Sequence, residues 1–316
     1  MTHVLLRSIS SFHVAGRTHS VAGLPAQQRQ TVAGGAARLA DPNGDYVVGQ
    51  LYAQEYRLAA PRHALPILLW HGGGMTGSHW ESTPDGRTGW LWRLLENGFD
   101  VFVSDAPERG RASWAPWPHL YKQAPLFRTK QEAWRMFRMG ADAGYHSDAR
   151  LRTPFDGQQF PLEAFDDFAQ QWVPRWTGHD DMAAAAYDAL IQRVGPCILV
   201  AHSQGGGYAV AAAQRHSQVR GVVAIEPAGV CSSTPAAAQP HLAVWGDHLD
   251  ERHPIWTGYR NSADRYWQEG RTAGLSYASL DLPRRGIRGN SHFPMLDRNS
   301  DQVLAEVLQW LDTQSL

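Results

Sequence analysis

The feature of this 316-residue sequence that most constrains its fold is a repeated alternation of short apolar segments with segments that have helical spacing. Continuous apolar runs are typical of strands buried on both faces, and the segments between several of them have apolar residues at helical spacing. This alternation predicts an α/β fold with a mostly parallel, twisted sheet and helices on both faces. The expected strands are 66–70, 99–104, 197–201, 221–225, 241–245 and 275–280, and the expected helices are 88–96, 180–194, 205–216, 258–273 and 300–313.

The N-terminal part differs from the rest because its apolar and polar residues alternate. Residues 10–22 alternate and are interrupted at Gly16, which predicts a hairpin that turns there. Residues 45–58 alternate more weakly and are expected to form a further strand.

One interval between expected strands is far too long for a single crossover helix, about ninety residues from 104 to 197. Within a single domain spanning 1–316, we therefore expect an insertion at 107–179, between the fourth and fifth core strands. It contains five of the tryptophans and several prolines, which favours a lid over the open end of the sheet. The alternative is a packed side domain that does not contact the substrate.

Composition excludes several classes of function. The formal net charge of −1 gives no electrostatic reason to expect binding to nucleic acid or to an anionic membrane surface. No run approaches the ~18 apolar residues of a membrane span, and the apolar patch 4–6 is too short for a signal-peptide core. We expect a soluble, cytoplasmic chain, or a periplasmic or secreted one if a leader has been lost. Of the two cysteines, Cys197 opens an apolar strand and is expected to be a buried thiol; no metal site or cofactor is indicated.

The segment Ala201-His-Ser-Gln-Gly-Gly206 stands between a buried strand and a small-residue helix. A serine at such a strand-to-helix turn is held in an exposed, strained position, and its neighbours two before and two after must be small. Ala201 and Gly205 meet that condition, although Ala201 replaces the usual glycine. The pattern predicts Ser203 as a nucleophile; the alternative is that Ser203 is only the N-cap of the helix.

A second glycine-rich loop, His71-Gly72-Gly73-Gly74, follows the expected strand 66–70. Loops of this kind supply one backbone N–H to an oxyanion, and the residue after the nucleophile supplies the other. The expected donors are therefore Gly73 or Gly74, and Gln204. His71 is expected to be structural, and the loop lacks the motifs of a phosphate or dinucleotide site.

The general base should follow the last strand, where His292 is the only histidine. The acid that orients it has two candidate positions. Asp247 or Asp250 follows strand 241–245, which is the commoner place for such an acid. Glu226 follows strand 221–225, and a carboxylate at the end of an apolar strand needs a partner such as an imidazole N–H. From the residues alone, these alternatives are even.

These motifs resemble the α/β-hydrolase superfamily and, more narrowly, a small bacterial esterase family that cleaves esters on halogenated cyclic compounds. The resemblance runs from near residue 11 to the C-terminus, and its most specific part is Trp80-Glu-Ser-Thr-Pro-Asp-Gly-Arg87. The other matching stretches are 11–14, 71–72 with 76–77, 110–111, 202–204, 226–227, 246–248, and 289–292 with 297–299. The chain departs from a member of that family at Gly73-Gly74, where that member has adjacent cysteines.

The resemblance implies Glu226 as the acid, and Gly73 and Gln204 as the oxyanion donors. It implies a serine carboxylic-ester hydrolase with a small-molecule ester as substrate, and it suggests a homodimer. The tryptophan-rich insertion favours apolar or cyclic groups in that ester. A peptidase, an amidase or an acyltransferase would use the same triad, and a catalytically inactive binding protein is the alternative from another class.

Overall fold

The computed structural model describes residues 3–121, 123–230, 234–249, 254–314 and 316. Its centre is an eight-stranded sheet in the order β1-β4-β6-β5-β7-β8-β9-β10. The strands from β6 to β10 run parallel, whereas β4 is antiparallel to both β1 and β6. The bounds are β1 Leu6–Val21, β4 Gly44–Leu58, β5 Ile67–Trp70, β6 Val101–Asp105, β7 Cys197–His202, β8 Val219–Ile225, β9 His241–Trp245 and β10 Tyr277–Asp281.

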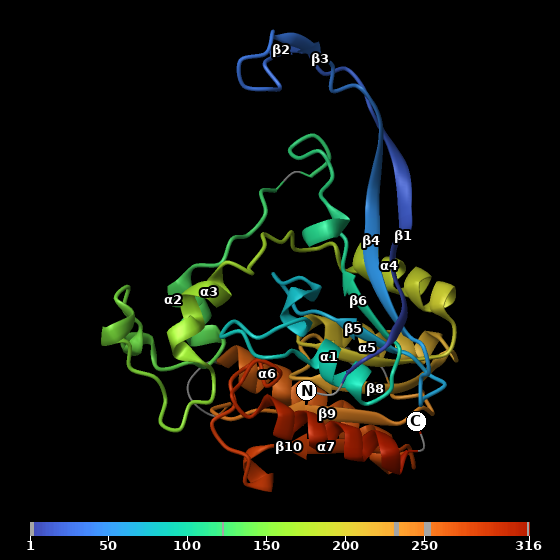
Figure 1. Ribbon diagram of the computed structural model, residues 1–316, viewed down its shortest axis with the longest axis vertical. Coiled ribbons are helices and arrows are strands. Elements are labelled where there is room, and N and C mark those ends of the chain that lie inside the picture. The colour runs from blue at the N-terminus through green and yellow to red at the C-terminus, as the bar shows by residue number, and fades with distance from the viewer. Residues whose placement is uncertain (1–2, 122, 231–233, 250–253, 315) are drawn as a thin grey trace.

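Helices cover both faces of this sheet, as the sequence pattern predicts (Figure 1). Apolar side chains of α1 (Trp90–Glu96) and α7 (Ser300–Thr313) belong to the core on one face. Those of α4 (Asp180–Val194), α5 (Gln204–Arg215) and α6 (Pro254–Thr272) belong to the core on the other. The strands β5, β6, β7 and β9 are wholly buried, and so is β8 apart from Arg220, which explains their continuous apolar sequences.

The predicted hairpin at residues 10–22 is wrong. These residues lie in one continuous strand, β1, which pairs with β4 along nearly its whole length. Gly16 and Gly49 both have positive φ, and the pairing passes from Ala15↔Gln50 to Arg17↔Val48, so neither glycine is paired. Because unpaired residues bend a ribbon instead of reversing it, the interruption at Gly16 is an irregularity of the β1–β4 arm. The arm projects from the body in Figure 1 and ends in the small sheet of β2 (Gln27–Arg29) and β3 (Arg38–Ala40).

The long interval between β6 and β7 contains the expected insertion. Residues 107–179 hold two α-helices, α2 (Lys130–Met136) and α3 (Phe165–Ala169), and otherwise short or irregular structure. Single-turn 3₁₀ helices occur here and elsewhere, at Gly77–Trp80, Gly110–Ala112, Asp142–Gly144, Ala149–Leu151, Leu162–Ala164 and Pro283–Arg285. Trp134 of the insertion is fully buried, whereas Trp114 and Trp117 are exposed.

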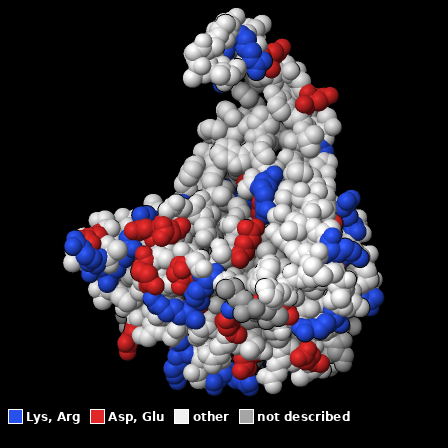
Figure 2. All heavy atoms as spheres, viewed as in Figure 1, with Lys and Arg blue, Asp and Glu red and all other residues white. Residues whose placement is uncertain are grey.

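The surface agrees with the balanced composition. On the face shown in Figure 2, acidic and basic side chains are interspersed over the body of the molecule. Cys197 is a buried free thiol, as predicted, and Cys231 lies outside the described residues. Among the helices of the described residues, none combines the length and apolarity that a membrane crossing requires.

Candidate active site

Ser203 stands at the turn between β7 and α5. Its backbone has φ 54° and ψ −119°, a conformation that side-chain-bearing residues rarely adopt and that commonly marks a functional position. The tight turn also explains the small neighbour at 205, because a Cβ added to Gly205 would lie 2.5 Å from the carbonyl oxygen of His71. The small residue predicted at position 205 is therefore required because two backbone segments, the turn at Ser203 and the loop at His71, approach each other closely.

His292 lies at the same end of the sheet, and its Nδ1 is 3.1 Å from Oε2 of Glu226. An ionised carboxylate only accepts hydrogen bonds, so Nδ1 carries the proton and Nε2 is left as the basic nitrogen. Ser203 and His292 line one cavity, although no hydrogen bond joins the two side chains in the structure. Burial lowers the pKa of His292 to about 4, and the neighbouring Glu226 opposes that shift.

Glu226 follows β8 directly, is fully buried, and has a positive φ of 50°. Its Oε1 accepts a 2.6 Å hydrogen bond from the backbone N–H of Gly246. Burial by itself would raise the pKa of this carboxyl, but the Arg138 guanidinium and His292 outweigh it and hold the pKa at about 2. Glu226 is therefore an anion at neutral pH.

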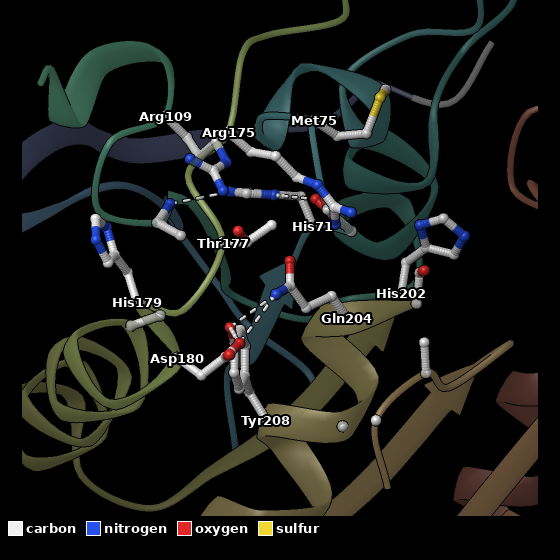
Figure 3. Close-up of a pocket in the computed structure, with 18 of the residues that line it drawn as sticks. His71, Met75, Arg109, Arg175, Thr177, His179, Asp180, His202, Gln204 and Tyr208 are labelled. Carbon is white, nitrogen blue, oxygen red and sulfur yellow. Dashed lines mark hydrogen bonds between the residues drawn. The ribbon is translucent and has the colours of Figure 1, made fainter. Parts of the chain in front are cut away.

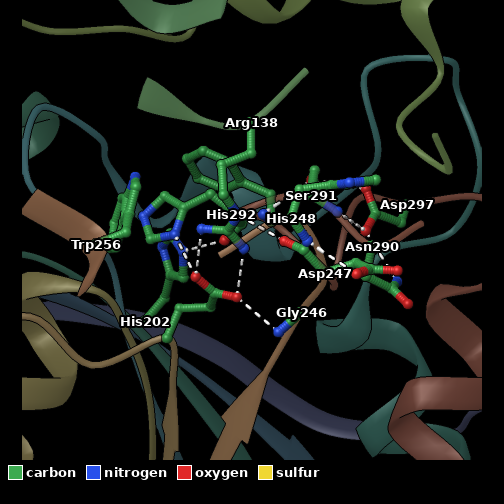
Figure 4. A network of polar contacts seen from close by, with 12 residues as sticks. Arg138, His202, Gly246, Asp247, His248, Trp256, Asn290, Ser291, His292 and Asp297 are labelled. Atoms are coloured by element: carbon green, nitrogen blue, oxygen red, sulfur yellow. Dashed lines mark hydrogen bonds and ion pairs between the residues drawn. The ribbon is translucent and has the colours of Figure 1, made fainter. Parts of the chain in front are cut away.

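Arg138 is the residue of this site that sequence reasoning missed. It belongs to the insertion, is buried, and forms an ion pair with Glu226 through both guanidinium Nη atoms. Its Nε donates to the carbonyl oxygen of Asp247 at 2.7 Å, so the insertion is joined to the loops after β8 and β9. Figure 4 shows this network around His292. No local sequence signal marks Arg138, because its partner is 88 positions away.

The other two candidates for the acid are Asp247 and Asp250. Asp247 does not contact the imidazole of His292. Asp247 Oδ2 accepts the backbone N–H of Gly289 at 2.9 Å, and Oδ1 accepts that of His248 at 2.9 Å. Asp247 therefore braces the loop that leads to His292 without contacting the ring. Asp250 lies outside the described residues.

The loop His71–Gly74 lies against the nucleophile turn. Its shape is set by His71, whose Nε2 accepts the backbone N–H of Ala106 at 3.0 Å, so that Nδ1 donates to the Gly72 carbonyl oxygen at 2.8 Å. His71 therefore has the structural role that the sequence suggested. A Cβ added to Gly72 would lie 3.0 Å from Cβ of Ser203. The backbone N–H groups of Gly73 and Gln204 donate no hydrogen bond to any described residue, so both are free to donate to a bound group.

The cavity beside Ser203 has a volume of about 490 Å³. The insertion contributes many of its walls. Trp176 alone of the five insertion tryptophans lines the cavity. Further apolar walls come from Met75, Met136, Phe137, Trp256 and Phe293. Figure 3 shows the polar side of the cavity, with Gln204, Tyr208 and Asp180 near one another.

Among the residues that the structure describes, no group of three or more His, Cys, Asp or Glu side chains is arranged to hold a metal ion.

Comparison with known proteins agrees with the fold described above. The family model described as the alpha/beta hydrolase fold matches residues 66–283. The chain belongs to the alpha/beta hydrolase family. A solved structure reported as a novel bacterial esterase superimposes with a TM-score of 0.83, at 28% identity, over 100% of this chain and 98% of that one. The chain is also 25% identical to the probable secreted lipase phiG of a fungal species (strain ATCC 74256), over 86% of this chain and 88% of that protein. The eight-stranded sheet and its flanking helices are those of this hydrolase family.

Proposed function

We propose that this hydrolase is a serine carboxylic-ester hydrolase that works through an acyl-enzyme, with Ser203 as nucleophile, His292 as base and Glu226 as acid. The similarity to a bacterial esterase and to a probable lipase supports a hydrolase of the esterase or lipase type. The observation that carries the assignment is the Nδ1–Oε2 distance of 3.1 Å between His292 and Glu226, beside a cavity that the strained Ser203 also lines.

In the proposed reaction, Ser203 Oγ attacks the ester carbonyl carbon while His292 Nε2 takes the hydroxyl proton. The backbone N–H groups of Gly73 and Gln204 stabilise the oxyanion, and the loss of one such donor typically costs ~2.7–4 kcal/mol of barrier. His292 then gives the proton to the leaving alcohol, and water attacks the acyl-enzyme by the same steps in reverse. Glu226 orients the imidazole and stabilises its cation.

The proposed substrates carry apolar or cyclic groups. The support is the apolar part of the cavity wall, to which Phe137, Trp176 and Trp256 contribute aromatic rings. Residues 107–179 are proposed to act as a lid, since two of these three side chains come from them. The relative named as a secreted lipase supports the exported alternative for this chain.

The test is the variant Ser203→Ala, assayed with p-nitrophenyl acetate. Turnover should fall by roughly 10⁴-fold or more while the circular dichroism spectrum stays that of the folded protein. Ser11→Ala, at an exposed position of β1, is the matched control and should retain full turnover. Wild-type rates in Ser203→Ala would refute the nucleophile.

Two further measurements separate the rival functions. Covalent labelling of Ser203 by a fluorophosphonate probe is expected, and the absence of labelling would favour an inactive binding protein. Turnover of matched ester and amide substrates distinguishes an esterase from a peptidase or amidase, and an amide hydrolysed faster than its ester would reverse the assignment.

A further inference from the structure

Three arginines line the same cavity as Ser203, namely Arg109, Arg128 and Arg175. All three belong to the insertion. Arg109 is only 7% exposed, so its guanidinium is held within the protein near the cavity. Figure 3 shows Arg109 and Arg175 next to each other, on the far side of Gln204 from Tyr208. A cavity for purely apolar esters has no use for this arrangement.

Two of these guanidinium groups form no ion pair with a carboxylate of the described residues. Arg128 pairs with Glu132 at 2.8 Å, but no ion pair of Arg109 or Arg175 occurs among the described residues. The one hydrogen bond that the Arg109 side chain donates there goes to the backbone oxygen of Glu108, at 3.3 Å. Burial lowers the pKa of Arg109, the negative charge of Glu108 opposes that shift, and the positive charge of Arg175 adds to it, so the two cations are close enough to repel.

The carboxylates that line the cavity are engaged elsewhere. Both carboxylate oxygens of Glu108 face Nδ1 of His179, at 2.9 and 3.0 Å. Asp180 Oδ1 accepts hydrogen bonds from the Tyr208 hydroxyl at 2.5 Å and from Gln204 Nε2 at 3.1 Å. Since unpaired charges in a partly dry site are costly, the arginine pair is a place where an added anion would be stabilised.

Arg175 is also positioned beside the oxyanion loop. Its Nη1 lies 2.5 Å from where a Cβ on Gly73 would be, so the guanidinium occupies the space that the missing side chain leaves. Its backbone exchanges two hydrogen bonds with Leu126, at 2.7 and 3.0 Å, which hold this segment of the insertion in place. A substrate anion bound by Arg175 would therefore lie close to the ester carbonyl that Gly73 is proposed to contact.

We propose that Arg175 and Arg109 form an anion-binding subsite that selects esters carrying a second, ionised carboxylate, such as the half-esters of dicarboxylic acids. The planar guanidinium matches a carboxylate in a two-pronged hydrogen-bonded pair. This inference rests on the proposed ester hydrolysis. Water and the half-ester give the dicarboxylate and the alcohol; the acyl C–O bond to the alcohol breaks, and the alcohol leaves with the proton from His292.

The kinetic test compares monomethyl glutarate, which carries a free carboxylate, with dimethyl glutarate, which does not. Arg175→Met should lower kcat/KM for monomethyl glutarate on the order of tenfold or more. It should leave dimethyl glutarate within about twofold of the wild type. Arg175→Lys, which keeps the charge, should retain part of the preference. Arg215→Met, on the exposed end of α5, is the matched control and should change neither ester. Equal losses of kcat/KM for both esters would overturn the proposed anion subsite. They would show instead that Arg175 helps to stabilise the oxyanion.

A binding measurement separates this inference from the proposed function. In the Ser203→Ala background, calorimetric titration should show monomethyl glutarate binding more tightly than dimethyl glutarate, and adding Arg175→Met should abolish the difference. Equal affinities for the two esters would refute the anion subsite while leaving ester hydrolysis by Ser203 intact. If Ser203→Ala keeps full turnover but the affinity difference is present, the nucleophile is wrong and the subsite stands.

Discussion

The guanidinium of Arg138 meets the carboxylate of Glu226 through two parallel hydrogen bonds, Nη1 to Oε2 at 2.8 Å and Nη2 to Oε1 at 2.6 Å. The same Oε2 atom is 3.1 Å from Nδ1 of His292. One residue of the insertion thus controls the charge of the proposed acid and the electrostatic environment of the proposed base. Removing it should change how activity depends on pH.

Arg138→Met should move the acid limb of the kcat/KM profile to higher pH. Without the guanidinium the pKa of Glu226 rises from about 2, and the pKa of His292 rises as well because a nearby positive charge is lost. Because both pKa values rise, Glu226 and His292 become protonated at a higher pH than in the wild type. The measurement is a pH–rate profile between pH 4 and about 8.

The variant should also lose stability, about 3–5 kcal/mol, because it removes the cation that is paired with a buried carboxylate. Arg138→Lys keeps a positive charge and should restore part of the acid limb. An unchanged pH profile in a folded Arg138→Met protein would show that Arg138 serves only packing.

Substitution of each acid candidate in turn tests the assignment of Glu226 directly. Glu226→Gln should lower kcat by about 10²–10⁴-fold, because the neutral amide no longer stabilises the imidazolium. Asp247→Asn should stay within about tenfold of the wild type, since the carboxylate of Asp247 accepts backbone N–H groups, from His248 and Gly289, and does not contact the imidazole of His292. Melting temperatures of both variants control for folding. The opposite ranking of the two variants would transfer the acid to the loop after β9.

Buried histidines should make the protein labile to acid. Burial lowers the folded-state pKa of five of them, to about 4 or below for four and well below 6.5 for His202, so in the unfolded chain they take up protons first as the pH falls. Their stabilising contribution is complete above pH 6.5 and is lost as the pH falls towards 4. The other four residues are His71, His79, His241 and His292.

Carboxyls whose pKa is raised by burial oppose this trend. Burial raises the pKa of Asp297 to about 7 and also raises that of Glu81, which favours the folded state as the pH falls below 7. The five histidines outweigh these carboxyls and leave a net loss, on the order of 5–10 kcal/mol between pH 7 and 5. Urea unfolding at several pH values measures it. His241→Phe, remote from Ser203, should reduce the slope by about one proton, and a stability that is constant with pH would contradict the predicted burial effect.

The glycine of the nucleophile turn should not tolerate a methyl group. In Gly205→Ala the new Cβ would meet the backbone oxygens of His71 at 2.5 Å and Trp70 at 3.1 Å, which cannot move like side-chain ends. We expect a loss of ~1–3 kcal/mol and much reduced turnover as the oxyanion loop is displaced. Gly258→Ala is the matched control, because nothing lies within 4 Å of its added Cβ in α6. It should gain ~0.5–1 kcal/mol by chemical denaturation.

The central sheet could be read from the sequence because its strands are buried on both faces. The predicted strand 241–245 and helices 180–194 and 300–313 coincide with β9, α4 and α7. The signals that mark Ser203 and His292 as candidates are also local, since each residue follows a strand, and their roles stay predictions. These signals depend only on neighbours in the chain.

Features that depend on distant contacts could not be predicted. The break at Gly16 suggested a reversal, because the sequence does not reveal that Gly49 stands at the matching interruption of β4. Arg138 follows α2 in irregular structure, and its role depends on Glu226, a residue in another element. The residues alone also left the acid open between two strands, and only the three-dimensional arrangement distinguishes the described candidates by their contacts.

The attachment of the insertion at its centre has a consequence for protein engineering. The Phe137 carbonyl oxygen accepts the backbone N–H of His292 at 3.0 Å, and the next residue, Arg138, holds Glu226. A chimaera that exchanges residues 107–179 for a relative's cover domain would thus remove a counter-ion together with the wall of the pocket. Grafts that retain Phe137 and Arg138 and replace only the flanking segments offer a route to new selectivity without dismantling the charge balance of the hydrolytic centre.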